Sequence, residues 1–288
     1  MTVGEAYSES VEFLVEHGFD RHEAQVSTRI GIDKILEIPY AHLVAPELSF
    51  DDEQRVDLHL FCLELIRGAP LFYLLGKIEF FGLQFCCDER ALIPRPETET
   101  LVENAIARLK NHAAPLVADL GTGSGCIAIS VAHELPQAVV YATDASRDAL
   151  ELAEKNARNL GVRSRVDFFE GGTGNWATPL LREGFAGKFD AILSNPPYIA
   201  TTEIETLQTQ IREYEPRAAL DGGADGLDCY RQIASQCGEL LALGGFLMCE
   251  LGAGQFADVR ASFESHGWRV EEPIPDLSRI ERVLCATR

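Results

Sequence analysis

The run Asn195-Pro196-Pro197-Tyr198 contains the residue types needed to hold a poorly nucleophilic nitrogen. The lone pair of an amide or exocyclic amine is delocalised, so a site must bind its N–H groups and aim the lone pair at the electrophile. The side-chain carbonyl of Asn195 and the backbone carbonyl of Pro196 can accept those N–H groups. Pro197 makes the turn rigid, and Tyr198 can pack against a planar substrate group. The run predicts catalysis by positioning for an in-line displacement, without a covalent intermediate.

A second run, Asp119-Leu-Gly121-Thr122-Gly123-Ser124-Gly125, lies between a predicted strand and a predicted helix. Its glycines let the backbone turn sharply and approach a ligand closely. Asp144 ends the next predicted strand, 23 residues after Gly121, where an acid can bind both hydroxyls of a ribose. The spacing Gly-x-Gly-x-Gly favours S-adenosylmethionine (SAM) over NAD. Asp119 favours it too, because an acid repels a pyrophosphate but tolerates a cationic sulfonium and ammonium.

Each run also has a purely structural interpretation. A glycine loop can be only a tight turn, and Asn-Pro-Pro can be a rigid turn that ends a strand. Here both runs follow predicted strands of one chain that also carries Asp144. This combination favours a binding site over two unrelated turns. We therefore predict that Asp119, residues 121–125, Asp144 and Asn195 bind the cofactor.

Alternating strands and helices must position these residues. We predict strands over 116–120, 139–143, 166–169, 189–194 and 245–251, helices over 126–134, 147–160 and 227–243, and two final strands over 268–272 and 282–286. Such alternation predicts a largely parallel sheet with helices on both faces. Ligands of open α/β sheets bind at the carboxyl ends of the strands, where the strand order reverses.

Two domains joined by a linker are expected along the chain. Residues 1–75 carry apolar residues at helical spacing, divided by prolines, and predict a small helical domain. Residues 76–95 cluster aromatic residues around Gly82 and predict a β-hairpin linker. Residues 96–288, which begin with an amphipathic helix through about Leu109, hold both functional runs.

Composition narrows the function classes. The chain has 45 acidic and 25 basic residues and a formal net charge of −20, which argues against nucleic acid and suits a protein partner. The eight cysteines lack zinc-site spacing, so we expect reduced thiols and no metal. The N-terminus has no apolar run, and no stretch reaches about 18 apolar residues. We therefore expect no signal peptide, no membrane partner and a cytoplasmic protein.

The most discriminating runs are Leu92-Ile-Pro-Arg95-Pro-Glu97-Thr-Glu99 and Asn195-Pro-Pro-Tyr198. They occur with Gly68-Ala-Pro-Leu-Phe-Tyr-Leu-Leu-Gly76, Phe80-Phe-Gly-Leu83, Asp119-Leu-Gly-Thr-Gly-Ser-Gly125, Thr143-Asp-Ala-Ser146, Glu215-Pro-Arg-Ala-Ala-Leu220 and Asp225-Gly-Leu227. Together these runs resemble the HemK-type glutamine methyltransferases, which modify the glutamine of the Gly-Gly-Gln motif in class 1 peptide chain release factors. The resemblance covers nearly the whole chain.

The resemblance implies an α/β fold, the Rossmann-like class I SAM-dependent methyltransferase. It implies a seven-stranded mixed sheet, whose last hairpin adds one antiparallel strand, and a small N-terminal helical domain that helps recognise the release factor. Gly121–Gly125 would wrap the methionine part of SAM, and Asp144 would hold the ribose. Asn195–Tyr198 would grip the target amide, and SAM would leave as S-adenosylhomocysteine.

Other residues follow from the resemblance with alternatives. Arg95, Glu97 and Glu99 would lie near the substrate entrance, although they could also serve a surface ion pair and a helix start. Trp176 or Asn175 would lie against the adenine. The surrounding run, Glu170-Gly-Gly-Thr-Gly-Asn-Trp176, is unusually rich in glycine for the family, and Trp176 could instead be a surface aromatic.

Three other functions stay open. A ribosomal protein could carry the target glutamine, because the same tetrapeptide serves both substrates. An adenine-N6 nucleic-acid methyltransferase would also use it, but would need base flipping and basic surface. A non-catalytic SAM-binding module is disfavoured by the intact Asn195, Asp144 and loop glycines. We expect a monomer.

Overall fold

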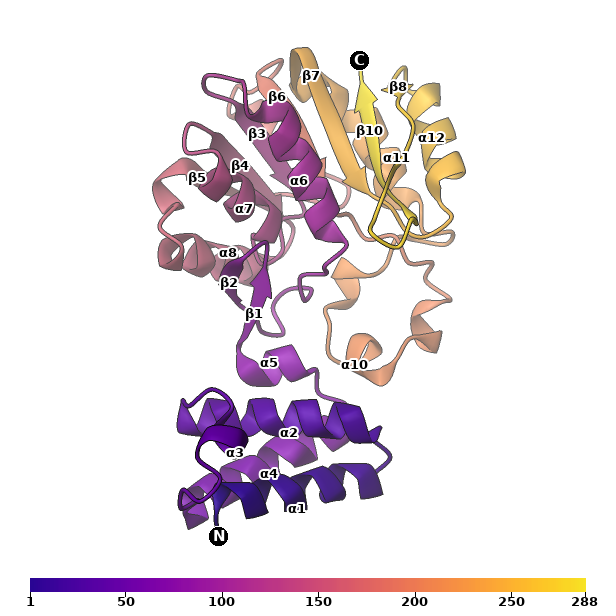
Figure 1. The fold of residues 1–288 in the computed structure, drawn as a ribbon. Helices are drawn as coiled ribbons and strands as arrows, with labels where there is room; N and C mark the ends of the chain where they lie inside the picture. The colour runs from indigo at the N-terminus through magenta and orange to yellow at the C-terminus, as the bar shows by residue number, and fades with distance from the viewer. The chain divides into compact units, whose positions relative to one another are not determined.

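The computed structural model describes all residues from Met1 to Arg288. They form two compact units, whose elements are labelled in Figure 1. The first unit contains residues 1–76 and 209–214, and the second contains residues 77–208 and 215–288. The hairpin that we expected to link two domains therefore lies within the second unit, and a short segment from late in the chain belongs to the first.

The first unit is helical, with α1 (Val3–Glu16), α2 (Arg21–Leu36), α3 (Ala41–Val44), α4 (Asp52–Ile66) and α5 (Leu71–Leu75). Capping boxes begin α1 at Thr2 and α4 at Asp51, where the cap side chain and the third helical residue satisfy each other's backbone N–H. Apolar side chains of these helices form a core of their own. The late segment contains α10 (Thr209–Arg212), and the hydroxyl of Tyr214 donates to the carbonyl of Arg67 at 3.2 Å.

A hairpin of β1 (Lys77–Phe80) and β2 (Leu83–Cys86) begins the second unit. Phe81 and Gly82 both have positive φ, 51° and 70°, as a two-residue turn between twisted strands requires. The Phe81 amide donates to Oε1 of Glu99 at 2.8 Å, so the first turn of α6 (Thr98–Leu109) holds the tip of the hairpin.

One mixed sheet forms the centre of the second unit. Its strands are β3 (Leu116–Leu120), β4 (Val139–Asp144), β5 (Val166–Glu170), β6 (Phe189–Ser194), β7 (Leu241–Glu250), β8 (Arg269–Val270), β9 (Ile274–Pro275) and β10 (Glu281–Thr287). The order is β5-β4-β3-β6-β7-β10-β8, with β9 paired to β10. Strands β3 to β7 pair in parallel, and β10 is antiparallel to β7. The seven-stranded mixed sheet is confirmed, with the two-residue β9 as an addition.

Helices flank this sheet, and Figure 1 shows α6 and α7 in front of it. Besides α6 they are α7 (Cys126–Glu134), α8 (Arg147–Asn159), α9 (Thr178–Arg182), α11 (Asp228–Gln236) and α12 (Phe256–Ser265), with 3-10 turns η1 (Arg163–Arg165), η2 (Ile204–Thr206), η3 (Arg217–Ala219) and η4 (Cys237–Leu240). A core of apolar side chains joins α11 and α12 to the sheet. None of the helices is both long and apolar enough to cross a membrane.

The helix predicted over 227–243 was too long. It ends at Gln236, η4 follows, and β7 already begins at Leu241. Leu241 pairs with Phe189 on β6, and the register then shifts so that Ala191 pairs with Phe246. Gly245 permits this close approach, since a Cβ there would lie 2.7 Å from the carbonyl oxygen of Phe189. A short apolar run fits either a helix or a buried strand, and pairing with β6 decides it here.

Candidate active site

The functional runs meet in one cavity at the carboxyl ends of β3, β4 and β6. The strand order reverses there, because β4 lies on one side of β3 and β6 on the other. The hydroxyl of Ser194 donates to the carbonyl of Leu120 at 2.7 Å and ties the ends of β6 and β3 together. Lining residues come from within 90–98, 121–127, 144–149, 172–176, 195–197 and 216–219.

The glycine loop forms one wall of this cavity. Gly121, Gly123 and Gly125 have φ of 73°, 55° and 84°, in the left-handed region that disfavours other residues. A Cβ on Gly125 would also lie 2.7 Å from Cδ1 of Ile129 on α7. The amides of Gly121 and Thr122 both donate to the carbonyl of Thr143 at 2.8 Å. The loop is thus fixed to the end of β4 by its own backbone.

Asp119 differs from the expectation that it binds the cofactor. Its side chain is fully buried and does not line the cavity. Its Oδ2 accepts from the hydroxyl of Thr122 at 2.6 Å and from the amide of Ala128 at 3.1 Å, while Oδ1 has no partner. Burial raises the pKa of Asp119 to about 7. Asp119 holds the glycine loop onto the start of α7, because its side chain points beneath the loop.

Asp144 lines the cavity, as expected of a residue that holds the ribose. Its Oδ2 accepts from the amide of Gly123 and its Oδ1 from the amide of Ser146, both at 2.8 Å. Burial raises its pKa, and these backbone amides oppose that shift. A carboxylate can accept about four hydrogen bonds, so both oxygens retain capacity for hydroxyl donors.

Trp176 also lines the cavity and is only 2% exposed, so it is not a surface aromatic. Its ring lies against Gly121, where a Cβ would be 3.4 Å from Cζ3. Two glutamines of α11 hold it: Gln232 accepts from the indole N–H and Gln236 from the backbone N–H, both at 3.0 Å. Asn175, the other candidate, is exposed and does not line the cavity.

From the tetrapeptide, Asn195 and Pro197 line the cavity, whereas Pro196 and Tyr198 lie beside it. Tyr198, which was expected to pack against the planar substrate group, is half-buried and packs against the core. The Tyr198 carbonyl accepts from Nε2 of Gln255 at 2.9 Å. Nδ2 of Asn195 donates to the hydroxyl of Thr98 at 3.2 Å, and that hydroxyl donates to Oε2 of Glu250 at 2.5 Å.

Arg95 lines the cavity and pairs with Glu215 at 2.5 Å, whereas Glu97 is exposed and lies outside the lining. Burial raises the pKa of Glu215, and Arg95 opposes that shift. Sequence reasoning missed Thr98 and Glu250, whose partners lie far away in the chain. It also missed Arg90, Cys126, Pro216, Ala218 and Ala219 as lining residues. The Glu215–Leu220 run carries part of the family resemblance, a signal that could have placed 216–219 here.

The cavity suits SAM by the chemistry of its walls. The glycine loop presents backbone to the cavity, Asp144 offers acceptors for a ribose, and Trp176 offers a buried aromatic wall. Asn195 stands at the same cavity with an amide that can accept a donor. The residues that suit SAM and the Asn195 amide therefore line the same cavity.

Comparisons with known proteins agree with this geometry. A family model described as methyltransferase small domain matches residues 98–222. A release factor glutamine methyltransferase of Geobacter sulfurreducens is 46% identical over 280 residues, which cover 94% of this chain and 92% of that protein. One from Moorella thermoacetica is 39% identical over 294 residues, covering 100% of this chain and 99% of that protein.

Among solved structures, a human methyltransferase 10 domain containing protein aligns with a TM-score of 0.51 and 17% identity, covering 71% of this chain and 88% of that chain. At this identity the likeness concerns the fold alone. It agrees with the α/β sheet, and the class I methyltransferase fold is confirmed. The match to a methyltransferase family model confirms SAM as cofactor. From the relatives that match along almost its whole length, the chain belongs to the release factor glutamine methyltransferase family.

Proposed function

We propose that this protein transfers the methyl group of SAM to the side-chain amide nitrogen (N5) of the glutamine in the Gly-Gly-Gln motif of class 1 peptide chain release factors. The observation that carries the proposal is Asn195, an amide fixed by Thr98 at the mouth of a SAM-type cavity. The relatives named as release factor glutamine methyltransferases support the choice of substrate. The reaction belongs to the cytoplasm, where peptide chains are released.

In this proposal the protein acts by positioning. Oδ1 of Asn195 and the carbonyl of Pro196 accept the two N–H groups of the glutamine amide and aim the nitrogen lone pair. Bound SAM supplies a methyl group on a cationic sulfur. Pro197 keeps the turn rigid, so the amide is held at a near-attack geometry. The amide proton leaves after transfer, which removes the need for a strong general base.

The cofactor contacts form the second part of the proposal. Gly121–Gly125 would hold the methionine part through backbone groups, and Asp144 would accept both ribose hydroxyls. Trp176 would provide the wall against which the adenine packs. Support comes from their common position along one side of the cavity.

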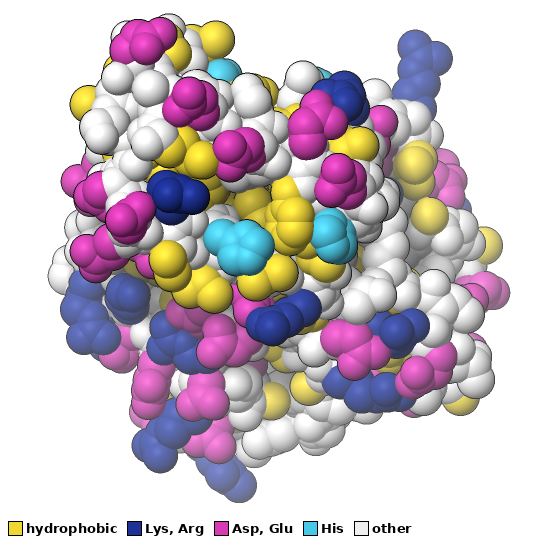
Figure 2. Space-filling view, turned by 90° about the horizontal axis from the view of Figure 1, so that it is seen from below, with side chains coloured by type: hydrophobic (Ala, Val, Ile, Leu, Met, Phe, Trp, Pro, Cys, Tyr) yellow, Lys and Arg dark blue, Asp and Glu magenta, His cyan; other side chains and the backbone are white.

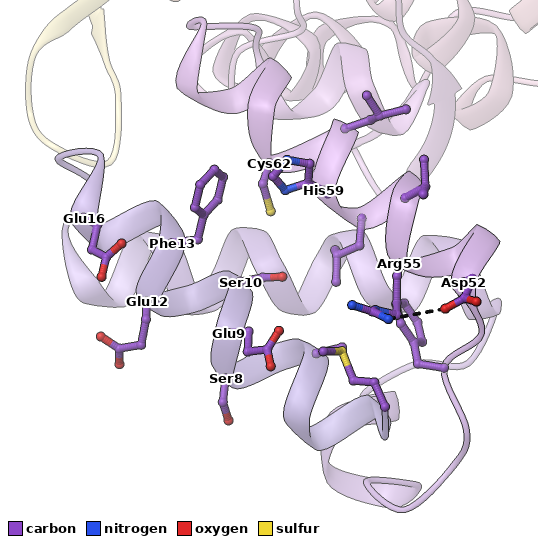
Figure 3. Close-up of a pocket in the computed structure, with 16 residues that line it drawn as sticks. Ser8, Glu9, Ser10, Glu12, Phe13, Glu16, Asp52, Arg55, His59 and Cys62 are labelled. Atoms are coloured by element: carbon purple, nitrogen blue, oxygen red, sulfur yellow. Dashed lines mark hydrogen bonds and ion pairs between the residues drawn. The ribbon is translucent and has the colours of Figure 1, made fainter.

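The first unit would supply contacts to the body of the release factor. A groove between α1 and α4 has the apolar side chains of Phe13 and Leu60 in its lining, with Glu9, Glu12 and Glu16 along α1 (Figure 3). Figure 2 shows a face of the molecule with apolar side chains in a hollow, bordered by acidic, histidine and basic side chains. Such a groove favours a partner surface with apolar anchors and basic residues.

Leu60→Asp tests this part, because Leu60 is 53% exposed in the groove. We expect the KM for a whole release factor to rise about tenfold, roughly 1.4 kcal/mol, with SAM affinity unchanged. Leu43→Asp is the matched control, since Leu43 is 67% exposed but lies outside the groove. Equal effects of both substitutions would remove the groove from the proposal.

The choice of substrate is tested by initial rates with methyl-labelled SAM. We expect label in a class 1 release factor and none in the same factor with Gln→Ala in its Gly-Gly-Gln motif. Label in ribosomal protein but not in the release factor would move the target glutamine there. Label in DNA or RNA alone would contradict an amide substrate.

A further inference from the structure

Three side chains form a hydrogen-bonded chain behind the catalytic turn. Asn195 follows β6, Thr98 is the first residue of α6, and Glu250 is the last residue of β7. Nδ2 of Asn195 lies 3.2 Å from the Thr98 hydroxyl, which lies 2.5 Å from Oε2 of Glu250. Thr98 and Glu250 are each 1% exposed, so water does not compete for these bonds. The chain ends at the cavity, because Asn195 and Thr98 both line it.

The direction of these bonds follows from the number of protons. An ionised carboxylate can only accept, so the single hydroxyl proton of Thr98 must go to Glu250. Thr98 is then left as an acceptor for its other neighbour. The Asn195 group that faces it must therefore be the NH2, which places Oδ1 on the other side of the amide.

We propose that Glu250, acting through Thr98, is a positioning residue that orients the Asn195 amide with its oxygen toward the substrate. The proposal rests on the proposed function and deepens it. It explains why a carboxylate and a hydroxyl are buried together at the end of β7.

Protonation of Glu250 would reverse the donor and acceptor roles along these hydrogen bonds. A neutral carboxyl can donate to Thr98, and Thr98 can then donate to Oδ1 of Asn195. The amide would turn and present N–H groups to a substrate that also offers N–H groups, and binding of the amide would be lost. The ionised form of Glu250 is thus the active one.

The ionisation falls in an accessible pH range. Burial raises the pKa of Glu250 to about 7, Glu97 adds to the shift, and Thr98 with two arginines opposes it. The titratable and charged groups around it are Arg95, Glu97, Arg282 and the neutral Tyr198, Tyr230 and Cys126. Because the ionised form is active, turnover should rise with pH through about 7.

Variants of Thr98 directly test the hydrogen-bonded chain from Glu250 through Thr98 to Asn195, which we call the relay. Thr98→Val removes the hydroxyl at nearly constant volume, and we expect kcat to fall about 10-fold to 100-fold, as for a misplaced catalytic group. SAM affinity should stay within about twofold, because the residues proposed to hold SAM are left unchanged. Thr98→Ser keeps the hydroxyl and should restore kcat to within about threefold. Thr100→Val, two residues along α6, is the matched control and should leave kcat unchanged.

Glu250→Gln tests the pH dependence. The amide introduced by this substitution cannot ionise and can either donate or accept, so we expect a lower kcat and loss of the acid limb of the kcat–pH profile. Full kcat in Thr98→Val, equal loss in Thr98→Ser, or an unchanged acid limb in Glu250→Gln would each overturn the relay. An inactive wild-type enzyme on the release factor would instead contradict the proposed function.

An NMR measurement tests the relay without any substrate. The side-chain amide signals of Asn195 are assigned by their loss in Asn195→Ala. In the wild type they should shift with a midpoint near pH 7, and in Glu250→Gln they should not. Signals that stay constant with pH in the wild type would contradict the coupling between Glu250 and Asn195.

Discussion

The two ends of the cavity are held in different ways. At the cofactor end, the glycine loop and Asp144 are fixed by backbone groups: Gly121 and Thr122 donate to Thr143, and Asp144 accepts from Gly123. At the amide end, Asn195 is fixed by side chains that are distant in sequence. Thr98 lies 97 residues before it, and Glu250 lies 152 residues after Thr98.

Because of this difference, we expect the cofactor end to determine SAM affinity and the amide end to determine kcat. Backbone contacts tolerate most side-chain changes, so the position of the glycine loop and of Asp144 depends on few side chains, of which Asp119 is one. The amide end depends on a single side-chain group and its orientation, because a nitrogen without an aimed lone pair does not react. Substitutions at the two ends should therefore change different measured quantities.

The largest effect is expected for Asn195→Ala. The substitution removes the acceptor that holds the substrate N–H, and we expect kcat to fall at least about 100-fold, as when an active-site hydrogen-bonding group is removed. SAM affinity, measured by calorimetry, should remain close to that of the wild type. A large loss of SAM binding would reassign Asn195 to the cofactor end and contradict the claim that the two ends of the cavity control different quantities.

A smaller effect is expected for Asp144→Ala, and it should change SAM affinity rather than kcat. Loss of hydrogen bonds to a charged acceptor should weaken SAM by roughly 1.5–3 kcal/mol, or about 10-fold to 100-fold in Kd. At saturating SAM, kcat should recover to near the wild-type value. Unchanged SAM affinity by calorimetry would contradict the ribose role of Asp144.

The smallest effect on SAM binding and turnover is expected for Asp119→Asn, which should instead change stability. Burial raises the pKa of Asp119 to about 7 in the folded state, so ionisation costs the folded protein stability as pH rises from about 4 to about 7. The variant amide cannot ionise, and the stability of Asp119→Asn relative to the wild type should grow over that window by about 1.4 kcal/mol per pKa unit. Glu250 titrates in the same window in both proteins, so part of the pH dependence will remain.

Unfolding curves at about pH 5 and about pH 8, on either side of the Asp119 pKa, measure this difference, together with the SAM affinity of each protein. Affinity within about threefold of the wild type is expected, because Asp119 lies beneath the loop and outside the cavity lining. A much weaker affinity without any change in stability would return Asp119 to direct cofactor binding.

The sequence predicted the cofactor end of the cavity better than the amide end. The cofactor end was readable because Gly121, Gly123, Gly125 and Asp144 belong to one strand–loop–helix–strand segment with a fixed spacing. Thr98 and Glu250 could not be predicted as partners of Asn195, since the pairing of β6 with β7 and the packing of α6 bring them together. The direction of the Asp119 side chain was also missed, because it points beneath the loop and is fully buried.

In the fold, long periodic segments were predicted well, including the helix over 126–134 and the strand over 189–194. The errors lie where a short apolar run has two possible partners. Residues 241–243 form a strand because β6 is available for pairing, which no local pattern reveals. The membership of residues 209–214 in the first unit likewise depends on contacts across the sequence.

The most direct test of the central claim is intact and peptide mass spectrometry of a class 1 release factor after incubation with this protein and SAM. We predict one added methyl group, about 14 Da, on the glutamine of the Gly-Gly-Gln peptide, and no added mass with Asn195→Ala. A folded release factor that gains no mass, while SAM binding by the protein is measured in parallel, would contradict the account.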